Sequence, residues 1–198
     1  MITSGSPGSS ARKTEIVDVA NGVSCSDMAN FPVGLSAAVG ANLDGTPVVC
    51  GGSGDASSGW STFYKCYRFG NGAWQEFASM NEKRGFAAGV IYNDKLHVFG
   101  GFSGSSESRT SEIINVNGVV NYGPDLPTEV FGHAMTAIDD TVSFLSGGLA
   151  NGNVASAKTW YYNHDTEAFT FGPDLLEGRR EHASAINVDK VTKSKIVV

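Results

Sequence analysis

Residues 80–101 read MNEKRGFAAGVIYNDKLHVFGG, and this stretch decides the fold. It holds a short apolar run, Phe86 to Tyr92, followed by a turn signal at Asn93-Asp94. A second β-prone run then ends in Gly100-Gly101. Because Asn, Asp and Gly favour turns, the pattern predicts two short antiparallel strands joined by a tight connection.

The same pattern recurs along the chain. Gly-Gly pairs also close β-prone runs at Gly51-Gly52 and Gly147-Gly148, at spacings of 49 and 47 residues. The segment Gly123–Leu126 returns 49 residues later as Gly172–Leu175. An aromatic or apolar residue also lies six positions before another apolar residue at Trp74, Val120 and Phe169. These markers share one period, which indicates internal repetition; we expect Trp74 and Phe169 to be buried between repeats.

Each repeat predicts four short strands. In the best-marked repeat they span roughly 36–42, 46–50, 63–69 and 73–78, joined by Asp-Gly, Gly-Gly-Ser-Gly and Asn-Gly connectors. Units of this length with four strands are typical of β-propeller blades. The predicted fold is therefore all-β, a propeller of about four four-stranded antiparallel blades. The predicted domain is a single one spanning 1–198, divided into a half blade at 1–31, full blades at 35–80, 86–126 and 133–175, and a half blade at 181–198.

These residues resemble the Kelch-repeat β-propeller family. An apolar strand ends in Gly-Gly, a Glu or Tyr lies on the next strand, and a Trp follows about seven residues later, with 80–101 as the best match. The resemblance covers nearly the whole chain, although Val120 replaces the Trp in one repeat and Cys25 takes roughly that position in the first. It implies Kelch-type blades in a protein-binding adaptor or scaffold.

The chain starts and stops at nearly the same phase of the repeat. A fourth blade could therefore combine strands from the two ends and close a small propeller. Kelch-like propellers generally have more blades than this, so we expect the chain to be a fragment of a longer propeller. A fragment without independent activity is one of the functional hypotheses.

Composition and motifs exclude several functional classes. The formal net charge of −6 argues against a nucleic-acid partner or an anionic membrane surface. The longest apolar run, Phe86 to Tyr92, is far too short to span a bilayer. No zinc, phosphate-binding or dinucleotide motif is present, so we expect no metal, no cofactor and no enzymatic activity. His133 and His182 occupy equivalent repeat positions, which predicts a structural role for both.

The spacing of two cysteines leaves two possibilities open. Cys50 ends the predicted second strand of a blade and Cys66 lies on the third, so the two strands should be antiparallel neighbours. A cross-strand disulfide would place the protein in an oxidising, extracellular environment. Two reduced thiols packed as small apolar groups would fit a cytoplasmic protein.

One face of the predicted propeller carries the longer loops. Strands alternate in direction, so the loops after the second and fourth strands of every blade lie together, opposite the short turns at Asp44-Gly45 and Asn93-Asp94. Long loops on a rigid scaffold are the usual place for binding, and Arg and aromatic residues are enriched at interfaces. We expect a protein partner on this face, with arginines pairing its carboxylates. The candidate residues are Trp60, Arg84, Phe102, Arg109, Phe131, Arg179 and Arg180.

A carbohydrate-active or glycan-binding propeller is the alternative hypothesis. Ser53, Asp55 and Trp60 match part of the Asp-box of sialidases, but the segment occurs once and follows the second strand instead of the third. This hypothesis requires acidic, His or Tyr side chains that converge on the propeller axis. No residue maps onto the two His and two Tyr of the copper oxidases that resemble galactose oxidase.

Overall fold

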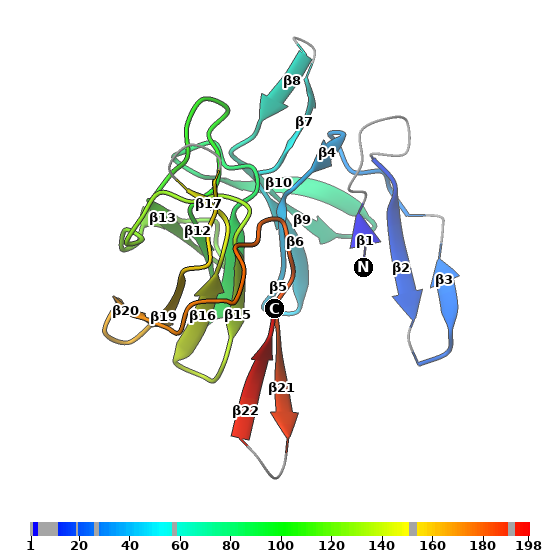
Figure 1. Ribbon diagram of the computed structural model, residues 1–198. Coiled ribbons are helices and arrows are strands. Elements are labelled where there is room, and N and C mark those ends of the chain that lie inside the picture. The colour runs from blue at the N-terminus through cyan, green and yellow to red at the C-terminus, as the bar shows by residue number, and fades with distance from the viewer. Residues whose placement is uncertain are drawn as a thin grey trace.

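The computed structural model describes residues 2–3, 12–18, 20–25, 28–56, 59–150, 154–189 and 193–198 (Figure 1). The regular elements of these residues are all strands. Three antiparallel sheets have four strands each, hydrogen-bonded in chain order from the inside outwards, as expected for propeller blades. In the described residues, no helix is long and apolar enough to cross a membrane.

The three four-stranded sheets succeed one another along the chain. The first blade consists of β5 (Val39–Leu43), β6 (Thr46–Cys50), β9 (Lys65–Gly70) and β10 (Ala73–Ser79). The second consists of β11 (Ala88–Tyr92), β12 (Lys95–Phe99), β13 (Ser111–Asn115) and β14 (Val120–Tyr122). The third consists of β15 (Ala134–Ala137), β16 (Val142–Ser146), β19 (Thr159–Asn163) and β20 (Ala168–Phe171).

Smaller sheets flank the blades. One contains β1 (Ile2–Thr3), β2 (Thr14–Asp18) and β3 (Val23–Cys25), and a hairpin contains β21 (Ala185–Asp189) and β22 (Lys193–Val197). Two further sheets involve the connections after second strands. In one, β7 (Ser53–Ala56) and β8 (Gly59–Thr62) follow β6 and are joined by β4 (Leu35–Ser36), which precedes β5; the other pairs β17 (Leu149–Ala150) with β18 (Val154–Ala155) after β16. Strands β7 and β8 pair antiparallel and project from the blades in Figure 1.

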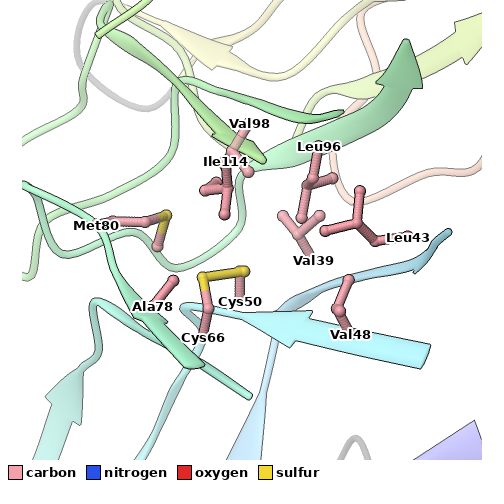
Figure 2. Packing of buried hydrophobic residues seen from close by; sticks show 10 residues of the cluster. All are labelled: Val39, Leu43, Val48, Cys50, Cys66, Ala78, Met80, Leu96, Val98 and Ile114. Carbon is pink, nitrogen blue, oxygen red and sulfur yellow. A yellow bond between two sulfur atoms is a disulfide. The ribbon is translucent and has the colours of Figure 1, made fainter. Parts of the chain in front are cut away.

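The hydrophobic core lies between successive blades. Between the first and second blades, Cys50, Cys66 and Met80 pack against Val98 and Ile114 (Figure 2). A second cluster joins the second and third blades through residues such as Phe99, Leu145, Trp160 and Tyr162. Because each cluster draws on two sheets, the burial of apolar side chains holds neighbouring blades face to face.

Equivalent residues of four repeats are linked around the axis. The amide of Phe86 donates to the carbonyl of Ala37 at 2.9 Å, that of Gly132 to Phe86 at 2.8 Å, and that of Glu181 to Gly132 at 2.6 Å. All four residues have a positive φ, between 52° and 64°. Each directly precedes the innermost strand region of its repeat, and β11 packs between β5 and β15, with β21 beside β15. The repeats are therefore arranged around one axis.

The Gly-Gly pairs have the backbone role expected of glycine. All six residues have a positive φ; that of Gly101 is 102°. A Cβ on Gly101 would lie 2.9 Å from the carbonyl oxygen of Gly85. Only glycine combines this conformation with such a close backbone approach at low cost.

Cys50 and Cys66 form a disulfide. They are direct partners across β6 and β9, with Cα atoms 4.1 Å apart, and both are buried. The structure therefore favours the disulfide over the reduced pair.

Trp74 is buried, as expected. Its ring packs edge-on against Phe31 and Phe69, and its Nε1 donates to Thr14 Oγ1 at 2.9 Å. Phe169 packs against Phe99 of the second blade but is only half-buried. Its place in β20 explains the difference, because this outermost strand is mostly exposed.

Candidate functional site

The segments after second strands and those after fourth strands lie on the same side of the molecule. Gly85, which follows β10, pairs with Phe102, which follows β12. In the next repeat, Phe131 pairs with Leu149 in the same way. We call this side the loop face; in the described residues it comprises segments 51–56, 59–64, 80–87, 100–110, 123–133, 147–150, 154–158 and 172–184.

Three half-buried phenylalanines gather on the loop face. The ring centroid of Phe131 lies 5.4 Å from that of Phe102 and 6.1 Å from that of Phe86. The sequence singled out Phe102 and Phe131 but missed Phe86. Its repeat position could have revealed it, since the equivalent residues are Ala37, Gly132 and Glu181 at the axis.

Arg84 is not a surface contact, contrary to the sequence-based expectation. Its side chain is fully buried, with Nε 3.1 Å from Oε1 of the equally buried Glu112. Nη1 donates to the carbonyls of Gly100 and Thr110 at 2.8 and 2.9 Å. Arg84 therefore pairs a carboxylate inside the protein and ties the end of the first blade to the second. A partner on the loop face cannot reach it without unfolding this contact.

The remaining arginines are exposed. Arg109 pairs with Asp125 at 3.2 Å, and both side chains are about half exposed. Arg179 and Arg180 are exposed and have no ion pair within the described part of the chain. Arg180 lies beside Gly132, the residue that follows Phe131 in the sequence. Trp60 lies in β8, but its side chain is outside the described residues.

A cavity of about 320 Å³ opens at the axis of the same face. It is lined by two consecutive positions from each of four repeats: Ala37, Ala38, Phe86, Ala87, Gly132, His133, Glu181 and His182. Two repeats thus contribute methyl groups and an aromatic ring, whereas the other two contribute imidazoles and a carboxylate. The sequence pointed to His133 and His182 as an equivalent pair, but not to a cavity between them.

The two imidazoles at the cavity are neutral at physiological pH. Burial, reinforced by nearby His182, lowers the pKa of His133 to about 3. Burial and the charge of Arg179 also lower the pKa of His182. His182 Nε2 lies 3.0 Å from Ser146 Oγ, which supports the structural role expected for this residue.

The ring nitrogens of these imidazoles are buried or hydrogen-bonded within the protein. Both ring nitrogens of His133 and Nδ1 of His182 are fully buried and have no partner among the described residues. The described residues also contain no group of three or more His, Cys, Asp or Glu side chains placed to hold a metal ion. The accessible chemistry of the cavity is therefore apolar, with the exposed Glu181 and the arginines around it.

Comparisons with known proteins support the fold. No family model and no curated protein matches the chain. A solved structure described as "Structure of YjhT" is similar, with a TM-score of 0.71 at 15% sequence identity. The match covers 82% of this chain and 59% of the other, so this chain spans less than two thirds of that protein's length. At this identity the likeness concerns the fold alone: the chain is an all-β protein with a propeller-like fold.

Proposed function

We propose that this chain is a Kelch-type propeller that serves as a protein-interaction module, with its binding site on the loop face. The observation that carries the proposal is the cluster of Phe86, Phe102 and Phe131 beside the axial cavity. Three separate segments bring these rings together on a rigid scaffold, where aromatic residues commonly dominate binding energy. The disulfide supports an extracellular or otherwise oxidising location.

Exposed arginines add positive charge to the proposed binding site. Arg179 and Arg180 flank the cavity and are free to pair with carboxylates of a partner. Arg109 is less available because Asp125 already holds it. The partner surface that fits is therefore an apolar anchor with acidic neighbours.

Glycan binding is the second candidate, because Glu181, His133 and His182 line the axial cavity. A sugar needs hydrogen-bond partners around its whole rim. The imidazole nitrogens are buried and do not offer such partners. The side of the cavity formed by Ala37, Ala87 and Phe86 has no polar side-chain atom to offer one. Protein binding is thus the better fit.

The test uses displayed random dodecapeptides as the probe, followed by calorimetry on the selected peptides. Arg179→Glu with Arg180→Glu, and separately Phe131→Ser, should each weaken binding about tenfold or more. The matched control reverses the charges of Asp44 and Asp94 on the opposite face and should leave the affinity unchanged. An equal loss of affinity in this control would show that the binding site does not lie on the loop face. Binding of monosaccharides without any peptide binding would favour the second candidate.

A further inference from the structure

A cluster of imidazole and phenol rings lies between the second and third blades, away from the loop face. Tyr92 and His97 come from the second blade, and Tyr162 and His164 from the third. The rings of Tyr92 and His164 are stacked with centroids 4.4 Å apart, and those of His97 and His164 meet edge-on at 5.1 Å. The ring centroid of Tyr162 lies 4.7 Å from that of His164. The cluster is thus part of the packing that joins the two blades.

Several polar atoms of this cluster are buried without a partner among the described residues. They are both ring nitrogens of His97, Nδ1 of His164 and the hydroxyl of Tyr162. His164 Nε2 has one partner, Ser143 Oγ at 2.8 Å. Buried polar groups are normally hydrogen-bonded, so four unpaired atoms in one place are unusual.

Few charges face the two imidazoles. Lys95 on β12 acts on His97 and opposes its protonation. Asp165, in the turn after β19, favours protonation of His164, but it accepts a hydrogen bond from Tyr92. Glu167 acts on Tyr162. In the described part of the chain, no carboxylate raises the pKa of His97, so a positive charge there would have no counter-charge.

We propose that this cluster is an acid-sensitive latch: uptake of protons by His97 and His164 separates the second blade from the third. Two imidazolium rings at this spacing repel each other, and each would be charged in an apolar interface. Opening the interface exposes both rings to water, which stabilises their charges and screens the repulsion between them. Acidification therefore shifts the packed interface towards an open one.

The size of the effect follows from linkage. Burial, together with His164 and Lys95, lowers the pKa of His97 from 6.5 to about 4. The open form keeps the ordinary pKa, so it binds more protons below pH 6.5, and the packed form loses stability until the pH reaches about 4. For His97 alone, the ratio of open to packed forms should rise about 20-fold from pH 7 to pH 5. Protonation of His164, whose pKa is also lowered by burial, adds to this.

The test is hydrogen exchange of the Gly132 amide, which donates to Phe86 across the second and third repeats, measured relative to the Phe86 amide, which donates to Ala37 of the first repeat. This reference amide in the same molecule cancels the intrinsic dependence of exchange on pH. We expect the Gly132 amide to exchange about 20-fold faster, relative to that of Phe86, at pH 5 than at pH 7. An equal increase at Phe86 would indicate global unfolding, and no increase at Gly132 would show that the two blades stay packed; either result would overturn the proposal.

Two variants assign the response to the histidines. His97→Phe has no nitrogen to protonate and should lose most of the increase. Val90→Ala weakens the same interblade core without removing a titrating group, so it should open more at every pH with the same pH dependence. If His97→Phe kept the full acid response, the latch would be wrong. Should that variant fail to fold, imidazole NMR titration of the natural protein decides: midpoints of His97 and His164 near 6.5 would overturn the proposal.

Discussion

Replacing Arg84 by Met should be among the most damaging single changes in the chain. Met keeps the apolar stem but removes the guanidinium, which leaves Glu112 buried and without its counter-charge. Glu112 retains three N–H donors, from the Asn81 amide, Asn81 Nδ2 and the Glu82 amide. Breaking a buried pair by removing one partner typically costs about 3–5 kcal/mol. Because the remaining donors stabilise part of the carboxylate charge, we expect a loss of about 3 kcal/mol in the free energy of unfolding.

Urea denaturation measures this loss as a lower midpoint with an unchanged slope. The matched control is Glu76→Gln, which breaks the exposed pair with Lys65 and should leave the midpoint nearly unchanged. The double variant Arg84→Met with Glu112→Leu removes both charges and should be more stable than Arg84→Met alone. If Arg84→Met behaved like Glu76→Gln, Arg84 would not be the buried tie between blades described above.

Three further changes probe the packing. Trp74→Ala should cost about 3–5 kcal/mol, because it removes a buried ring and the partner of Thr14; an unchanged thermal melt would contradict this. Reduction of the Cys50–Cys66 bond, or its replacement by two alanines, should cost about 3 kcal/mol for a loop of this length, and mass spectrometry of unreduced peptides should show the bond. Gly101→Ala should cost about 1–3 kcal/mol because of its positive φ and the nearby Gly85 carbonyl; a neutral effect in urea denaturation would refute that strain.

The strand order of the blades was predictable because its signals are local. Turn formers such as Asp44-Gly45 and Asn93-Asp94, and the Gly-Gly pairs, mark where the chain must reverse, and their period reveals the repeats. The placement of Cys50 and Cys66 on neighbouring strands followed from the same strand order, whereas the choice between a disulfide and two reduced thiols did not. Each inference needed only residues that are close together in the sequence and the spacing of the repeats.

The burial of single loop residues was not predictable in this way. Arg84 lies in a loop segment and carries a charge, so the sequence favours exposure. Its burial depends on Glu112 of the next blade, 28 residues away, which no local pattern reveals. In the equivalent position after the third blade, Arg179 is exposed. The axial cavity was missed for the same reason, since it forms only when four repeats meet.

The arrangement of four successive repeats around one axis is the central claim, and three backbone amides report on it directly. The amides of Phe86, Gly132 and Glu181 each donate to the equivalent residue of the preceding repeat. Hydrogen exchange followed by NMR should show all three strongly protected, in contrast to the amide of Asn117 in an exposed turn. Exchange of the three amides as fast as that of Asn117 would contradict the arrangement, whatever the strand content of the individual blades.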